Sequence, residues 1–208
     1  MKLIGMLDSP YVRRVAISLD LLGVPFEHEA VSVFSTFERF QSINPVVKAP
    51  TLVCDDGDLL MDSSLILQFV EATAGRSLWP AEALPLQHAF RAVGLALAAS
   101  EKSVQIVYER NLRPVEAQYA PWIARVTGQL SAAYAALEQE VARHPALFST
   151  VHCQAAITAA VAWQFTQSMV ADIVPAAAHP RLVALSARLE CTAAFQNHPP
   201  AGPGVPAV

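Results

Sequence analysis

The first third of the chain alternates between short apolar runs and segments with apolar residues at helical spacing. Residues 3–7 form a compact apolar run, which predicts a buried strand. Apolar positions three and four apart follow over residues 12–22, and Gly23 predicts the end of this helix. Residues 26–31 alternate as a strand does, and residues 36–43 are predicted as a short helix. The chain therefore begins with strand, helix, strand and helix.

The next part of the pattern supplies two more strands and a third helix. Residues 51–54 and 59–61 are apolar, and the turn-forming Asp-Asp-Gly sequence between them predicts a hairpin. An apolar stripe at helical spacing follows and ends near Gly75. In the resulting order βαβαββα, the helical crossover implies parallel pairing and the hairpin adds an antiparallel pair. This order predicts a mixed four-stranded sheet with helices packed against it.

The pattern changes after this first domain. Two prolines and a loss of regular spacing predict a linker over residues 78–85. Beyond it, Ala, Leu, Gln and Glu dominate, and no convincing strand occurs before Phe195. We therefore expect a sheet-containing α/β domain over residues 1–77 and an all-α helical bundle over residues 86–208.

Proline interruptions divide the second domain into segments. Residues 150–170 are apolar almost all round, so they are predicted as the central helix of the bundle. The tail from His198 is rich in Pro and Gly and is expected to be loose. The helices are expected over residues 86–112, 116–143, 150–170 and 180–191.

The composition excludes several classes of protein. The 208 residues are 53% hydrophobic and only 15% charged, which is typical of a packed chain and not of a disordered one. The net charge is −4 without a run of Lys or Arg, so no nucleic-acid partner is expected. The most apolar run, residues 155–163, is too short to span a membrane, and the start of the sequence lacks a signal-peptide pattern.

The cysteines and histidines give no pattern of ligands or disulfides. Cys54, Cys153 and Cys191 are odd in number, and their spacing fits neither a disulfide framework nor a zinc site. The six histidines are scattered along the sequence. No metal site is therefore predicted, and the reducing cytoplasm is the expected compartment.

Three motifs follow one another in the first domain. Residues 9–13 read Ser-Pro-Tyr-Val-Arg, residues 44–53 read Asn-Pro-Val-Val-Lys-Ala-Pro-Thr-Leu-Val, and Asp62-Ser63 precedes the third predicted helix. Their order and spacing, with the βαβαββα domain and the helical domain behind it, resemble the bacterial glutathione S-transferases. His179-Pro180-Arg181-Leu182 is also similar to bacterial members. The resemblance implies a thioredoxin-like N-terminal domain that binds glutathione.

The sequence departs from the family pattern at two positions. Val47 stands where the family usually has Gly, before the lysine of the second motif. Cys153 stands where the family usually has the Asp of a Ser/Thr-x-x-Asp capping box, which here begins at Thr150. Losing that carboxylate should cost the helical domain about 1 kcal/mol or less, and it concerns stability rather than the active site.

Ser9 is the candidate catalytic residue. A hydroxyl at a strand-to-helix junction lies beside the positive end of the helix dipole, where it can donate a hydrogen bond to an anion. In the resemblance that anion is the glutathione thiolate, which is the nucleophile. The alternative is an ordinary helix cap. Because no cysteine occurs at this junction, dithiol exchange there is excluded.

Pro50 is predicted to follow a cis peptide bond, with an ordinary trans proline at a strand edge as the alternative. A cis bond would turn the backbone N–H and C=O of Ala49 outward, where they could pair with the cysteinyl part of glutathione like an added strand. Lys48 is a candidate for binding the glycyl carboxylate, or else a solvated lysine.

Asp62 and Ser63 complete the predicted glutathione site. Ser63 is expected at the N-terminus of the third helix, where unpaired N–H groups could bind the γ-glutamyl carboxylate. Asp62 could bind the ammonium group, and the alternative for both is a helix cap without a ligand. Candidates for a second-substrate pocket between the domains are aromatic, and each could equally belong to a core or a dimer surface: Tyr11, Phe34, Tyr108 and Trp163.

The resemblance implies a glutathione transferase that adds the thiolate to a small hydrophobic electrophile. Glutathione-dependent isomerisation or dehalogenation is an alternative within the same fold. A third is a non-catalytic interaction protein similar to the stringent-starvation proteins that bind RNA polymerase. A homodimer is also implied, with the Ala-rich first helix of the helical domain near the twofold axis.

Overall fold

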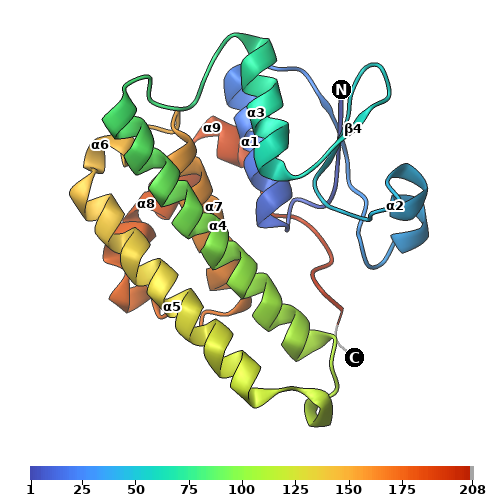
Figure 1. Cartoon of the computed structure of the whole chain (residues 1–208), viewed down its shortest axis with the longest axis vertical. Coiled ribbons are helices and arrows are strands. Elements are labelled where there is room, and N and C mark those ends of the chain that lie inside the picture. The colour runs from blue at the N-terminus through green and yellow to red at the C-terminus, as the bar shows by residue number, and fades with distance from the viewer. Residues whose placement is uncertain (207–208) are drawn as a thin grey trace. The chain divides into compact units, whose positions relative to one another are not determined.

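The computed structural model describes residues 1–206, which divide into two units (Figure 1). Met1–Leu78 and Thr192–Gly204 form the N-terminal unit, and Trp79–Cys191 forms the body of the helical unit. The sequence-based division assigned all of residues 86–208 to the helical domain. The segment Thr192–Gly204 instead belongs to the N-terminal unit, because it contacts the first helix.

The N-terminal unit is built on a mixed sheet, as predicted. Within the described residues its strands are β1 (Lys2–Ile4), β2 (Glu27–Glu29), β3 (Thr51–Val53) and β4 (Leu59–Leu60), in the order β2-β1-β3-β4. Strand β1 pairs in parallel with β2 and antiparallel with β3, and β3 pairs antiparallel with β4. This topology confirms the predicted thioredoxin-like βαβαββα domain.

Helices cover both faces of this sheet. Helices α1 (Pro10–Leu22) and α3 (Ser63–Ala74) pack against each other on one side, and α2 (Phe37–Ile43) lies on the other (Figure 1). On the α2 side the side chains of Ile4, Val31 and Phe40 form a buried cluster. The sheet therefore holds the beginnings of α1 and α3, which carry the candidate residues, in fixed positions.

Local sequence sets the limits of α1. Pro10 begins the helix, where its missing N–H costs nothing because first-turn N–H groups have no partner within the helix. Gly23 ends it with φ 69°, and the N–H of Val24 donates to the Leu19 carbonyl over 3.0 Å. This backward bond is the Schellman pattern that favours glycine at a helix end.

The C-terminal segment is bound to the N-terminal unit, so the expectation of a loose tail from His198 is wrong for the described residues. Helix α9 (Ala193–Asn197) packs on α1. The Arg13 guanidinium donates from Nε to the His198 carbonyl over 2.8 Å, and the Asp8 N–H donates to the Ala201 carbonyl over 3.0 Å. A buried arginine on α1 and a backbone N–H just before this helix thus hold a segment whose composition alone suggested a loose tail.

The helical unit confirms the predicted all-α bundle. In it α4 packs against α5 and α7, and α7 packs against α8. The predicted central helix is α7, whose residues 154–163 are all buried. The unit comprises α4 (Ala83–Asn111), η1 (Val115–Ala117), α5 (Ala120–Arg143), α6 (Pro145–Phe148), α7 (Gln154–Met169), η2 (Ala176–Ala178) and α8 (Pro180–Glu190).

Two helix starts differ from the sequence-based expectation. Helix α4 begins at Ala83 rather than 86, because Pro85 lies in its first turn, where a proline is tolerated. Helix α7 begins at Gln154 rather than 150, and the Thr150 hydroxyl instead accepts the His152 N–H in a local turn, over 3.1 Å. The residue that caps α7 is therefore Cys153, not Thr150.

Candidate functional site

Ser9 is the N-cap residue of α1, at the junction that follows β1. Its backbone is extended, with φ −73° and ψ 125°, and its carbonyl accepts the Arg13 N–H over 3.0 Å. The Ser9 hydroxyl makes no capping hydrogen bond. The residue therefore occupies the cap position through its backbone rather than through its hydroxyl.

Asp62 and Ser63 lie at the start of α3, where they make different contacts. Asp62 is the N-cap, and its Oδ1 accepts the N–H groups of Ser64 over 2.8 Å and Leu65 over 3.3 Å. Asp62 therefore caps the helix, and both capping bonds use the same oxygen. Ser63 is only 2% exposed and is held by a basic side chain from α1.

That basic side chain is Arg14, a residue that the sequence analysis did not single out. Its guanidinium is buried, and Nη1 donates to the hydroxyls of Ser63 and Ser64 over 3.2 Å each. Desolvation lowers the pKa of Arg14 to about 10, opposed by the nearby Asp62 carboxylate, so the group stays charged at neutral pH. A full positive charge thus adds to the dipole at the N-terminus of α3.

A signal for Arg14 was present in the sequence. Arg13 and Arg14 lie in a helix whose neighbouring positions are apolar, and both arginines are buried in the structure. Arginine is seldom fully buried unless its donors are satisfied. Two adjacent arginines among the apolar positions of a predicted helix therefore indicate partners on other elements.

The loop before β3 agrees with the predicted geometry. The Ala49–Pro50 peptide bond is cis, which confirms the prediction, and Pro50 is buried at the start of β3. The Thr51 hydroxyl donates to the Lys48 carbonyl over 2.6 Å, which fixes the backbone on either side of Ala49. The Lys48 side chain is exposed, and its role in binding the glycyl carboxylate stays a prediction.

Val47 shows why the family usually has glycine in this loop. Its φ is 51°, in the left-handed region that side chains branched at Cβ rarely adopt. The valine side chain packs partly buried against the cluster around Phe40. This contact with the core accounts for a bulky residue at a position where the backbone favours glycine.

Asp8 is a second residue that the sequence analysis did not single out. It directly precedes Ser9, and its Oδ2 accepts the Gly204 N–H over 2.9 Å. Burial raises the pKa of the Asp8 carboxyl, and hydrogen bonds from Gly204 and Ser9 partly offset this. The bound C-terminal segment therefore lies directly beside the candidate catalytic junction.

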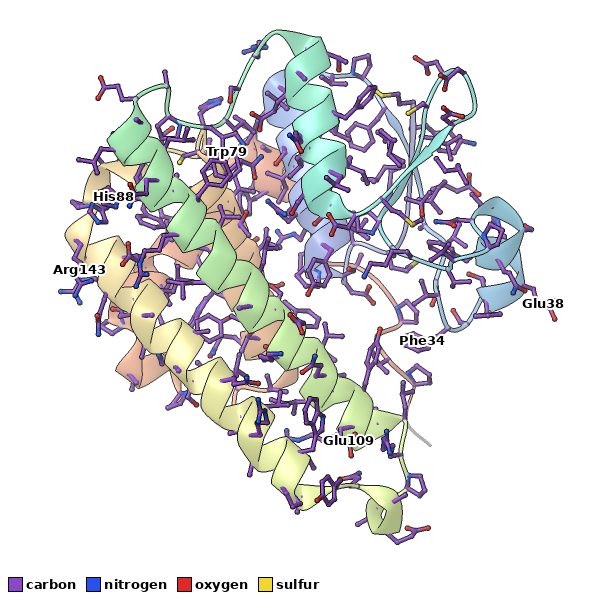
Figure 2. All side chains as sticks on the ribbon, in the orientation of Figure 1. Phe34, Glu38, Trp79, His88, Glu109 and Arg143 are labelled. Atoms are coloured by element: carbon purple, nitrogen blue, oxygen red, sulfur yellow. The ribbon has the colours of Figure 1, made fainter. Side chains whose placement is uncertain are left out.

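The aromatic candidates for a second-substrate pocket differ in their surroundings. Tyr11 and Phe34 (labelled in Figure 2) are half-buried in the N-terminal unit, and Tyr108 is 39% exposed on α4 of the helical unit. Trp163 is 4% exposed and makes an edge contact with Tyr134, at 5.4 Å between ring centroids. Trp163 thus lies in the core of the helical unit, which was the alternative considered for it, whereas the pocket roles of the other three stay predictions.

Comparison with known proteins agrees with these motifs. Residues 3–78 match the family model of the glutathione S-transferase N-terminal domain. A glutathione S-transferase from Methylobacterium radiotolerans, solved in complex with glutathione sulfonate, has a TM-score of 0.84 and 26% sequence identity to this chain. That similarity covers 100% of this chain and 95% of the other. The N-terminal unit thus matches the glutathione S-transferase N-terminal domain, and the whole chain shares the fold of glutathione S-transferases. This confirms the resemblance noted in the sequence.

Two further proteins are similar to this chain over very different lengths. A family member from Pseudomonas fluorescens Pf-5, solved with bound glutathione, has a TM-score of 0.83 and 25% identity, covering 97% of this chain and 99% of that one. The uncharacterized GST-like protein YibF of Escherichia coli K12 is 34% identical over 71 residues, which is 34% of this chain and 35% of YibF. The chain thus matches only about a third of the length of this curated relative.

Membrane attachment through a spanning helix finds no support in the fold. Within residues 1–206, none of the helices combines the length and the apolar character needed to cross a membrane.

Proposed function

We propose that this protein binds glutathione in its N-terminal unit and transfers the glutathione thiolate to a small hydrophobic electrophile. The observation that carries the proposal is the Ser9 hydroxyl, which makes no capping bond although Ser9 is the N-cap of α1. A hydroxyl and the positive end of a helix dipole together favour an anion at this position. The match to the glutathione S-transferase N-terminal domain supports glutathione as the source of that anion.

The γ-glutamyl end of glutathione carries both a carboxylate and an ammonium group. We assign the carboxylate to the N-terminus of α3 at Ser63, where buried Arg14 adds positive charge through the serine hydroxyls. We assign the ammonium group to Asp62, because the capping bonds occupy Oδ1 and Oδ2 is left for a second donor. Opposite charges at adjacent positions would fix the orientation of this end of the ligand.

The rest of glutathione is assigned to the loop before β3. The backbone of Ala49 would pair with the cysteinyl residue in the manner of an added strand, and Lys48 would bind the glycyl carboxylate. With the γ-glutamyl end at α3, this arrangement directs the thiol toward Ser9. Tyr11 and Phe34 of the N-terminal unit are proposed to contact the electrophile.

Ser9 would act by donating its O–H to the sulfur. This hydrogen bond and the dipole of α1 lower the pKa of the bound thiol, so that the thiolate is present at neutral pH. The sulfur lone pair then forms the new C–S bond, and a leaving group departs or the adduct accepts a proton. The thiols of Cys54 and Cys153 are poor substitutes, because burial raises the pKa of both.

Binding is tested by calorimetric titration of glutathione into the wild-type protein and the Asp62→Ala variant. We expect weaker binding in Asp62→Ala and unchanged binding in Glu38→Ala, which removes an exposed carboxylate from α2 (labelled in Figure 2). If millimolar glutathione gives neither heat nor thermal stabilisation to the wild-type protein, the transferase proposal fails. The interaction-protein alternative would then be favoured.

Catalysis is tested with the Ser9→Ala variant and a panel of aryl halides, enones and haloalkanes. Removing a hydrogen-bond donor to a developing or stabilised anion typically lowers turnover by about 10²- to 10³-fold. We expect a loss of that order with glutathione affinity nearly unchanged, and no loss in Ser131→Ala on the exposed face of α5. Unchanged turnover in Ser9→Ala would assign thiolate stabilisation to another group, and the preferred electrophile would distinguish conjugation from isomerisation or dehalogenation.

We further propose a homodimer in the cytoplasm. Leu65 and Phe69 on α3 are 58% and 40% exposed, and in the helical unit Phe90 is 56% exposed and stacks on Trp79. Apolar groups of this size support a subunit interface. The three cysteines are free thiols, which suits a reducing compartment. Light scattering on the wild-type and Phe90→Glu proteins tests the dimer, which the charged variant should weaken.

A further inference from the structure

Two histidines and a glutamate that lie far apart in the sequence meet in the helical unit. His88 lies near the start of α4, while Glu140 and His144 lie at the end of α5. Spacing of four residues places Glu140 and His144 on one face of α5, and the packing of α4 against α5 brings His88 to them. One ligand-capable atom from each of the three lies within 4.8 Å of the others. Figure 2 shows His88 on α4 beside the end of α5 that carries Arg143.

Glu140 supplies the observation that points to a ligand. It is 2% exposed, and its Oε1 is paired with Arg91 over 2.9 Å and lies 3.7 Å from the guanidinium of Arg143. Its other oxygen, Oε2, is buried without any hydrogen bond in the described part of the chain. A buried carboxylate oxygen that lacks a partner carries a desolvation cost and calls for a partner such as an ion.

The imidazole rings of His88 and His144 lie next to each other and to the Glu140 carboxylate. The His88 and His144 rings stack with 3.8 Å between centroids, and Nε2 of His144 lies 3.7 Å from the unbonded Oε2 of Glu140. Both rings are half-buried, so each can turn about its side-chain bonds without breaking the core. Metal–nitrogen bonds of about 2.0–2.1 Å would require the ligand atoms to approach by roughly 1.5 Å, which such a rotation supplies.

The donor set determines the kind of ion. Two imidazole nitrogens and one carboxylate oxygen suit Zn²⁺ and neighbouring divalent transition metals, and leave a fourth position for water. Ca²⁺ and Mg²⁺ require oxygen ligands and are disfavoured. Arg91 and Arg143 would hold the carboxylate through Oε1, as outer partners of metal ligands often do, and their charge would limit the affinity.

We propose that His88, Glu140 and His144 form a binding site for a divalent transition metal of the zinc type. The bound ion joins the start of α4 to the end of α5 and so stabilises the helical unit. The site uses none of the residues assigned to glutathione, so it is independent of the transferase chemistry. The spacing of these residues in the sequence did not indicate the site, because His88 and Glu140 are 52 positions apart.

The proposal is tested on full-length protein stripped of metal with a chelator. Calorimetric titration with Zn²⁺ should show one ion bound per chain and a rise in the melting temperature. Titration with Co²⁺ should give the intense visible absorption of a low-coordinate nitrogen and oxygen site. In His88→Ala and His144→Ala, Zn²⁺ binding should weaken at least tenfold and the Co²⁺ band should disappear.

The control is His152→Ala, which removes an exposed histidine from the loop before α7. This variant should bind Zn²⁺ and Co²⁺ as the wild-type protein does. His88→Gln keeps a polar side chain of similar length, so it replaces His88→Ala if the alanine variant does not fold. Absence of binding at millimolar Zn²⁺, or equal binding by the His88 variants and the wild-type protein, would overturn the proposal.

Discussion

Arg14 on α1 donates a 3.2 Å hydrogen bond to the hydroxyl of Ser63 in the first turn of α3. The two residues are 49 positions apart in the sequence, yet the packing of α1 on α3 brings them into contact. The guanidinium is buried and remains protonated, because desolvation lowers the pKa of Arg14 only to about 10. The N-terminus of α3 therefore carries more positive charge than its helix dipole alone provides, which suits it to a carboxylate.

Replacing Arg14 by methionine should weaken glutathione binding by about tenfold with a small change in stability. The methionine keeps most of the buried volume, and an apolar replacement of a buried charge is often tolerated. The loss of positive charge at Ser63 should raise the Kd for glutathione, which calorimetry measures directly. Arg125→Met, on the exposed face of α5, is the matched control. A folded Arg14→Met protein with wild-type affinity would contradict the role given to this residue.

Replacing Asp8 by asparagine should stabilise the protein at neutral pH. Burial raises the pKa of the Asp8 carboxyl, so the folded state binds a proton there more readily than the unfolded state. The free energy of unfolding therefore rises as the pH falls through the pKa that Asp8 has in the folded state. Above that pKa the charged carboxylate destabilises the folded state. Because the group is only half-buried, we expect a gain of less than about 1 kcal/mol at pH 7.

Urea unfolding of the Asp8→Asn and wild-type proteins at pH 7 and in acid measures this effect. The advantage of the variant should shrink as the wild-type carboxyl becomes protonated. Asp56→Asn, in the exposed hairpin turn, should show no such dependence. A variant that is less stable than the wild type at pH 7 would show that the charged hydrogen bonds to Asp8 outweigh its desolvation.

The elements of the fold could be predicted because their signals are local. The alternation around residues 26–31 and the Asp-Asp-Gly turn each lie within one short segment, and the sheet follows from their order. The cis bond at Pro50 was predicted from a motif of ten residues and is present. Ser9 and Asp62 were likewise placed correctly at helix starts, since caps have sequence signatures.

The contacts that were missed join residues far apart in the sequence. Arg14 meets Ser63 because α1 packs on α3, and His88 meets Glu140 because α4 packs on α5. The C-terminal segment was expected to be loose from its composition, but composition does not show that Arg13 and Asp8 form hydrogen bonds with it. Composition and spacing describe one segment at a time, whereas these features depend on pairs of segments.

Replacing Gly202 by alanine should release the C-terminal segment from Asp8. A Cβ atom at this glycine would overlap the Asp8 carboxylate, so either the segment or the carboxylate must move. Hydrogen exchange should then show faster exchange at Gly204, whose N–H donates to Asp8. Gly128→Ala, on the exposed face of α5 with open space around it, should leave this exchange unchanged. Full protection of the Gly204 N–H in Gly202→Ala would show that the segment is held elsewhere.

Replacing Cys153 by serine should stabilise the helical unit. Cys153 is the N-cap of the central helix α7, with a backbone suited to capping, and its sulfur lies beside the N–H groups of Ala155 and Ala156. A serine hydroxyl is nearly the same size and accepts an N–H of the first turn, at Ala155 or Ala156, far better than a thiol does. The gain should be about 0.5–1 kcal/mol, reduced by the cost of burying the hydroxyl.

Urea denaturation measures this change, with the exposed Cys191→Ser as the matched control, which should be neutral. Because α7 packs against both α4 and α8, better capping of α7 should raise the unfolding midpoint of the whole helical unit rather than reduce fraying at one end only. If Cys153→Ser lowers the midpoint, burial of the hydroxyl costs more than the cap contributes. The cysteine would then be the better residue for this buried position. The departure from the family's capping box would then favour packing around α7 and would not lower the stability of the helical unit.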